Sequence, residues 1–121
     1  MTPVATSKSK SKTPALATAL LSLFGCASAS EISSVPESAL VIDVRTPREF
    51  RDWHYPGALN IPVHELADRL DELGDPKQDV VVYCRSGSRS SSAKQILTDN
   101  GFTQVKNGGG LQDMRPLVIA K

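Results

Sequence analysis

Residues 80–97 read VVVYCRSGSRSSSAKQIL, and this stretch predicts the fold of the chain. An apolar, β-branched run ends at Cys84, a polar loop containing a glycine follows, and a helical pattern then begins. The run predicts a buried strand over 79–84, and short strands that alternate with helices are typical of a parallel sheet. Because ligands of such sheets bind beyond the carboxyl ends of the strands, Cys84 is predicted to lie in a functional site.

The loop after Cys84 has the composition of an anion-binding turn. Gly87 permits a tight turn that a Cβ would hinder, so successive backbone N–H groups can face inward. The positive end of the following helix adds to their effect. These donors favour thiolate over thiol, so we expect a lowered pKa for Cys84 and an activated nucleophile. The structural alternative is a buried cysteine that merely ends a strand.

Upstream of this loop, residues 39–45 (ALVIDVR) form a second apolar, β-branched run and predict another buried strand. A short helix is predicted from Pro47 to Trp53. Thr46 and Glu49 have the spacing of a capping box, and proline is favoured at the first helical position. Later segments follow the same α/β alternation: a loop (54–62), an amphipathic helix (63–73), a helix within 89–101, a third strand (102–107), and a glycine turn leading to a short helix or loop (108–114).

The first 29 residues have the pattern of an export signal. Three lysines (Lys8, Lys10 and Lys12) precede the apolar run ALATALLSLF at 15–24, and small residues follow. That run is too short to span a bilayer, which needs roughly 20 residues. We therefore expect a secretory signal over 1–29, a linker over 30–38 and a domain over 39–121. In the alternative interpretation, a lipoprotein signal covers 1–25 and Cys26 becomes the lipidated first residue.

Charge and cysteine content restrict the function further. The net charge of +1 becomes −2 without the three leading lysines, so no basic surface favours nucleic acid as a partner. His54 and His64 are too few for a metal site, which needs three or four ligands, and we predict no metal. Removal or lipidation of Cys26 leaves Cys84 as a free thiol, so no intramolecular disulfide is expected.

Four segments together resemble the successive motifs of the rhodanese-like sulfurtransferase family. They are DVRTPREF (43–50), PGALNIP (56–62), VVVYCRSGSRSSSA (80–93) and GGGLQDM (108–114). The resemblance runs from about Val41 to Met114 and is greatest to single-domain periplasmic thiosulfate sulfurtransferases of the phage-shock protein E type. It implies an α/β fold: a single rhodanese-like domain with a small parallel sheet and helices on both faces. It also implies the periplasm as the location, or a membrane-anchored lipoprotein if Cys26 is lipidated, and no cofactor.

The resemblance assigns roles to particular residues. Cys84 would attack thiosulfate and carry its outer sulfur as a persulfide, which cyanide, another thiophile or a protein thiol then accepts. Asp43 and Arg45 would belong to a supporting network that borders the site. The active-site loop would consist of Arg85, Ser86, Gly87, Ser88 and Arg89.

Several alternatives remain open from the sequence. Phosphatases of the same fold place five residues between cysteine and arginine, whereas four separate Cys84 from Arg89, so the smaller ring favours a persulfide sulfur over phosphate. A non-catalytic binding or redox-sensing module is the second functional hypothesis. Arg89 either binds the substrate anion or braces the loop through carboxylates. Arg85 either attracts thiosulfate or is simply solvated.

Overall fold

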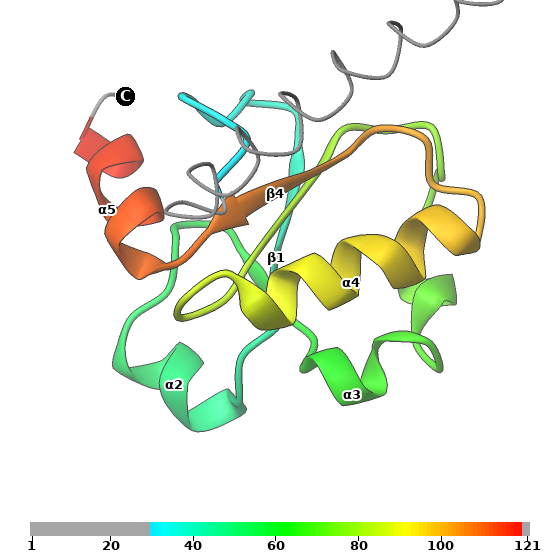
Figure 1. Ribbon diagram of the computed structural model, residues 1–121, viewed down its shortest axis with the longest axis horizontal. Coiled ribbons are helices and arrows are strands. Elements are labelled where there is room, and N and C mark those ends of the chain that lie inside the picture. The colour runs from blue at the N-terminus through cyan, green and yellow to red at the C-terminus, as the bar shows by residue number, and fades with distance from the viewer. Residues whose placement is uncertain (1–29, 120–121) are drawn as a thin grey trace, which may run out of the picture.

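The computed structural model describes residues 30–119, without the side chain of Ile119, so the expected signal over 1–29 and Cys26 lie outside the described residues. Its centre is a four-stranded parallel sheet with the strand order β2-β1-β3-β4 (Figure 1). The strands are β1 (Leu40–Asp43), β2 (Leu59–Asn60), β3 (Val80–Tyr83) and β4 (Val105–Gly109). Within residues 30–119, no helix is long and apolar enough to cross a membrane.

One face of the sheet is covered by α3 (Val63–Leu66), the 3-10 helix η3 (Leu70–Glu72) and α4 (Ser88–Asp99). Alternate strand residues such as Ile42 and Val82 point to this side, as the pleat of a strand requires, and join its buried cluster. Cys84 belongs to the same cluster, which places the thiol beneath the start of α4.

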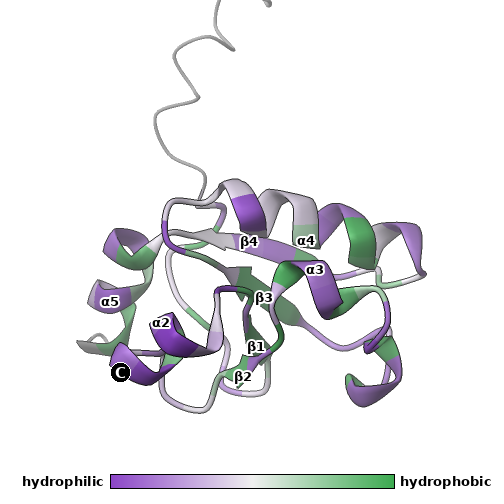
Figure 2. Cartoon of the chain, turned by 90° about the horizontal axis from the view of Figure 1, so that it is seen from below, coloured by the Kyte–Doolittle hydropathy of each residue, from purple (hydrophilic) through white to green (hydrophobic). Residues whose placement is uncertain are grey.

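The opposite face is covered by α5 (Leu111–Ile119), whose Met114 packs against Val81 and Tyr83. Figure 2 colours β1 and β3 at the centre of the molecule as mostly hydrophobic, whereas α2 is largely hydrophilic. The predicted α/β domain, a small parallel sheet with helices on both faces, is therefore confirmed.

The short helix after the first strand also agrees with its prediction. α2 spans Pro47–Asp52, with the proline in its first turn. Thr46 Oγ1 accepts from the backbone nitrogen of Glu49 at 3.2 Å, and Glu49 Oε1 accepts from the backbone nitrogen of Thr46 at 3.0 Å. This reciprocal capping box fixes where the chain turns after β1, because it satisfies donors that the helix leaves free.

The prediction of a third strand over 102–107 is wrong by two to three residues, since β4 begins at Val105. Phe102 is buried and donates its N–H to the carbonyl of Leu97 at 3.0 Å, so it closes the end of α4 instead of joining the sheet. β4 also extends through Gly108 and Gly109, which were predicted to form a turn. A Cβ at Gly108 would meet side chains of Met114 and Val81, so glycine allows α5 to pack closely on the strand.

Three further elements differ from the sequence-based expectation. The predicted loop over 54–62 contains β2, a two-residue edge strand. The single helix predicted over 63–73 is divided into α3 and η3. The predicted short helix or loop that ends at Met114 is instead a helix, α5, which continues past Pro116 to Ile119.

Candidate active site

Cys84 immediately follows the carboxyl end of β3, and its side chain lies inside a ring of hydrogen-bond donors. The residue is 0% exposed. Its Sγ accepts from the backbone nitrogen of Gly87 at 2.9 Å and from that of Ser90 at 3.3 Å. The hydroxyl of Ser90 lies 3.4 Å from the same sulfur. The expected inward-facing amides are therefore present around the thiol.

The sulfur takes the place of a capping side chain at the start of α4. The N-cap residue is Gly87, whose φ of 102° lies in the left-handed region that favours glycine and which has no side chain to cap the helix. The third helical N–H, that of Ser90, would ordinarily bond to such a side chain. It bonds to Cys84 Sγ instead, so one helix-terminal donor is directed at the nucleophile.

These contacts decide the ionisation of the thiol. Burial raises the pKa of Cys84, because it removes water from the charged form. Hydrogen bonds from the Ser90 hydroxyl and from the backbone N–H groups of Ser90, Gly87 and Ser86 outweigh burial, so the pKa of Cys84 lies below its ordinary value. The direction agrees with the prediction made from the loop composition.

Behind the loop, Asn107 of β4 supports the Ser90 hydroxyl, a role that sequence analysis missed for both residues. Ser90 Oγ lies 2.7 Å from Asn107 Oδ1 and 3.0 Å from the carbonyl of Gly87. Asn107 Oδ1 also accepts from the backbone nitrogen of Gly109 at 2.8 Å. Glu31 binds the other side of Asn107: its N–H donates to the Asn107 carbonyl at 2.7 Å, and its Oε1 accepts from the Asn107 backbone nitrogen at 2.9 Å.

The first half of the predicted loop is closed by the residues that precede α5. Ser86 forms an isolated antiparallel bridge with Gly110, and the carbonyl of Arg85 accepts from the backbone nitrogen of Leu111 at 3.2 Å. The Arg85 side chain is exposed, and Ser88 is an exposed residue at the start of α4. The backbone of Arg85 and Ser86 is thus held by hydrogen bonds to the start of α5, while the Arg85 side chain is available to bind an anion.

Arg89 binds a carboxylate of α2. Its guanidinium binds both carboxylate oxygens of Glu49, at 3.0 and 3.2 Å. The hydrogen bond from Arg89, followed by those from Thr46, lowers the pKa of Glu49 to about 2 despite the opposing effect of partial burial. Of the two roles considered for Arg89, this geometry is that of a brace, which ties the start of α4 to the capping box of α2.

The predicted supporting residues form a buried network at the carboxyl end of β1. Arg45 Nε and Nη2 bind the Asp43 carboxylate at 2.9 and 2.7 Å, and both side chains are almost fully buried. Tyr83 donates its hydroxyl to Asp43 Oδ2 at 2.8 Å and accepts the Tyr55 N–H at 2.9 Å. Arg45 also donates to the Trp53 carbonyl, so the network anchors the end of α2.

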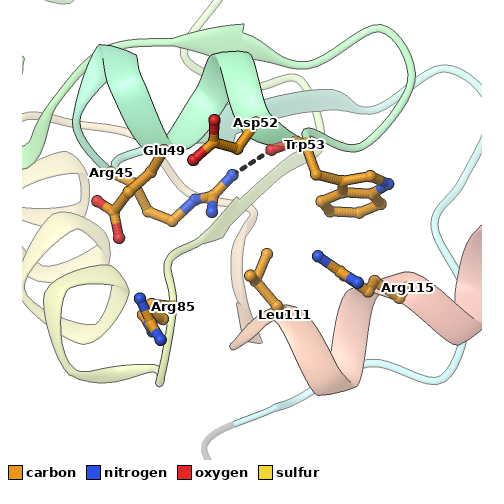
Figure 3. Close-up of a pocket in the computed structure, with 7 residues that line it drawn as sticks. All are labelled: Arg45, Glu49, Asp52, Trp53, Arg85, Leu111 and Arg115. Atoms are coloured by element: carbon orange, nitrogen blue, oxygen red, sulfur yellow. Dashed lines mark hydrogen bonds between the residues drawn. The ribbon is translucent and has the colours of Figure 1, made fainter.

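A cavity of about 270 Å³ opens beside this network and the Cys84 loop. Figure 3 shows its lining residues, contributed by the end of β1, by α2, by the loop and by α5: Arg45, Glu49, Asp52, Trp53, Arg85, Leu111 and Arg115. Cys84 does not line the cavity itself, but its neighbour Arg85 does. Among residues 30–119, His, Cys, Asp and Glu side chains do not gather in any group of three or more that could hold a metal ion.

Comparison with known proteins identifies the family of the chain. The sequence model of the rhodanese-like domain family matches residues 27–113. Thiosulfate sulfurtransferase PspE of Escherichia coli (strain K12) is 45% identical over 74 residues, which are 60% of this chain and 71% of that protein. A protein named sulfurtransferase from Allochromatium vinosum is 43% identical over 72 residues, covering 59% of this chain and 65% of that protein.

A solved structure described as a rhodanese with anions from E. coli superposes with a TM-score of 0.62 at 40% identity. The superposition covers 64% of this chain and 93% of that chain, so nearly the whole of that fold is present here. The family match covers well over half of the sequence and includes the sheet, α4 and the cysteine loop. The chain therefore belongs to the rhodanese-like domain family.

Proposed function

We propose that the chain is a thiosulfate sulfurtransferase that carries sulfane sulfur on Cys84. The proposal rests chiefly on one observation: Sγ accepts hydrogen bonds from the N–H groups of Gly87 and Ser90 at the N-terminus of a helix. Similarity to proteins named sulfurtransferase supports a sulfurtransferase role. The proposal further specifies thiosulfate as the sulfur donor and a Cys84 persulfide as the intermediate.

In the first step the Cys84 thiolate attacks the outer sulfur of thiosulfate. A new S–S bond forms to Sγ, the S–S bond of thiosulfate breaks, and its electron pair leaves with sulfite. The charge is conserved, because a thiolate and a dianion become a persulfide anion and a dianion. The lowered pKa of Cys84 supplies the thiolate without a separate base, and the N–H groups around the sulfur would also stabilise the persulfide.

In the second step a thiophile takes the outer sulfur. Cyanide, for example, bonds to that sulfur, the bond to Sγ breaks, and thiocyanate leaves while Cys84 returns to the thiolate. Neither step needs an oxidant or a reductant. We further propose that this cycle runs in the periplasm, since lysines, an apolar run and small residues follow one another over 1–29.

The test is the intact mass of the protein after incubation with thiosulfate and removal of excess reagent. Wild type should gain one sulfur atom and release an equal amount of sulfite. Addition of cyanide should then remove the sulfur from the protein. Cys84→Ser should gain none, while Ser92→Ala, at an exposed position of α4 outside the loop, should load normally. A wild type that takes up no sulfur contradicts the proposal and favours a binding or redox-sensing module.

A further inference from the structure

The cavity beside the Cys84 loop is larger than the proposed donor needs. Its volume of about 270 Å³ far exceeds the roughly 10–15 Å³ that a cavity needs to hold one water molecule. Thiosulfate is a compact tetrahedral dianion, so space remains when it lies beside Arg85. A small organic molecule would fill the rest. The cavity is therefore large enough to hold the molecule that accepts the sulfur.

Two arginines of the cavity, Arg85 and Arg115, have no ion pair with any residue of the described range 30–119, and they lie on different sides of the cavity. Figure 3 shows Arg85 on the loop and Arg115 on α5, with Leu111 between them in that view. Arg85 adjoins Cys84 in the chain, whereas Arg115 stacks over the Trp53 ring, with its Cζ 4.9 Å from the ring centroid. A guanidinium held on an aromatic face is preorganised to bind an anion.

The charges around the cavity favour an anion. Arg45 is neutralised by Asp43, and Glu49 is paired with Arg89. No ion pair joins the remaining ionisable lining groups to another residue within 30–119: Asp52, Arg85 and Arg115. These three leave one net positive charge, and Trp53 and Leu111 add apolar surface to the lining of the cavity.

From this arrangement we infer that Arg115 is a specificity-determining residue that selects low-molecular-weight thiols carrying a negative group. The inference rests on the proposed function. The acceptor's short carbon chain lies against Leu111 and Trp53, its carboxylate or sulfonate binds Arg115, and its thiolate reaches the outer sulfur on Cys84. A bond forms between the acceptor sulfur and the outer sulfur, the bond to Sγ breaks, and the electron pair returns to Cys84 as the thiolate.

The experiment compares four thiols that share a two-carbon chain and differ in charge: 2-mercaptoethanesulfonate, 3-mercaptopropionate, 2-mercaptoethanol and cysteamine. Thiosulfate is the sulfur donor throughout, and kcat/KM for each acceptor thiol is measured with wild type and with Arg115→Gln. The ratio of wild type to variant for each thiol removes differences in intrinsic nucleophilicity. We expect a ratio of about five to ten for the two anions, about one for the neutral thiol and below one for cysteamine.

Two matched variants accompany this comparison. Arg48→Gln removes the same charge from an exposed position of α2 that does not line the cavity, and its ratios should be near one for all four thiols. Arg115→Lys keeps the charge but loses the planar group stacked on Trp53, and it should retain part of the preference for anions. Arg115 is exposed, so thermal unfolding of both Arg115 variants should match that of wild type.

The outcomes separate this inference from the proposed function. If wild type gains no sulfur from thiosulfate, the proposed function itself fails. If wild type loads sulfur and transfers it, but Arg115→Gln lowers all four rates equally or none, the inference is overturned while the function stands. Equal effects of Arg48→Gln and Arg115→Gln would also overturn it, because the preference would then come from overall charge.

Discussion

Ser90 donates a hydrogen bond of 2.7 Å to Oδ1 of Asn107, and the same hydroxyl lies 3.4 Å from Sγ of Cys84. The carbonyl of Gly87, at 3.0 Å, is a third possible acceptor, and a hydroxyl with one proton cannot serve all three at full strength. While Cys84 is a thiol, its S–H can donate to Ser90, whose proton then goes to Asn107. Once Cys84 is ionised, the proton is better directed at the sulfur. The pair thus provides a donor that follows the charge of the nucleophile.

Ser90→Ala should therefore raise the pKa of Cys84, because it removes a hydrogen bond to the charged sulfur, and such a bond is worth about 1.5–3 kcal/mol. The pKa is read from the ultraviolet absorbance of the thiolate against pH. The alkaline shift should also appear in the rate of sulfur uptake, since a lower thiolate fraction reacts more slowly near neutral pH. Ser92→Ala, on the exposed side of the same helix, is the control and should leave both quantities unchanged. An unchanged pKa in Ser90→Ala would mean that the backbone amides suffice.

Glu49→Gln tests the brace between α2 and the loop. Glutamine preserves the capping box but not the charge, so the variant isolates the ion pair with Arg89. We expect a loss of about 1–2 kcal/mol in unfolding free energy at neutral pH, a modest figure because the Arg89 side chain is 35% exposed. The folded pKa of Glu49 is lowered to about 2 from an ordinary 4.5, so this stabilisation is present above about 4.5 and disappears as pH falls toward 2.

Urea unfolding of wild type and Glu49→Gln over a series of pH values provides the measurement. The difference between the two proteins should be constant from neutral pH down to about 5 and should shrink below it. A difference that does not depend on pH would assign the effect to packing rather than charge.

Asp43→Ala should destabilise the fold by about 3–5 kcal/mol, because it leaves Arg45 buried without its partner. Chemical denaturation measures the loss. The double variant Asp43→Leu with Arg45→Met removes both charges and should recover part of it. If Asp43→Ala lowers the free energy of unfolding by less than about 1 kcal/mol, water in the adjoining cavity must solvate Arg45 in the variant.

Gly110→Ala should displace the active-site loop, since an added Cβ would overlap the carbonyl oxygen of Arg85. We expect the rate of sulfur uptake to fall roughly tenfold to hundredfold, the usual effect of misplacing a reacting group. Gly57→Ala is the matched control, because its φ of 85° makes alanine strained there while no atom lies within 4 Å of the new Cβ. The control should lower stability by about 1 kcal/mol and leave sulfur uptake unchanged. Equal rates in the two variants would show that the loop tolerates the displacement.

Local interactions explain which parts of the fold were predictable. The capping box of Thr46 and Glu49 spans three residues, so its sequence pattern determines the start of α2. β2, in contrast, consists only of the pairs Ile42 with Leu59 and Asp43 with Asn60. Its existence depends on a distant strand, and neighbouring prolines and a glycine indicated a loop.

The same distinction applies to the site. Gly87 and Cys84 are three residues apart, so the turn that brings an amide to the sulfur follows from the sequence. Glu49 lies 40 residues from Arg89, and Arg115 meets Trp53 only because the fold brings α5 to the residue that follows α2. Residue types suggested that Arg89 could have a carboxylate partner, but only the fold identifies which one.

The contact between Glu31 and Asn107 matters for the choice of the first residue of a recombinant protein. Glu31 lies two residues beyond the predicted signal, yet it bonds to both backbone groups of Asn107 and to the ammonium of Lys94. A recombinant chain that begins at β1 would lack Glu31. The edge of β4 would then have lost this partner directly behind Ser90, whose hydroxyl faces Cys84. Such a shortened version would suit neither crystallisation trials nor kinetic assays, and an affinity tag belongs ahead of Ser30.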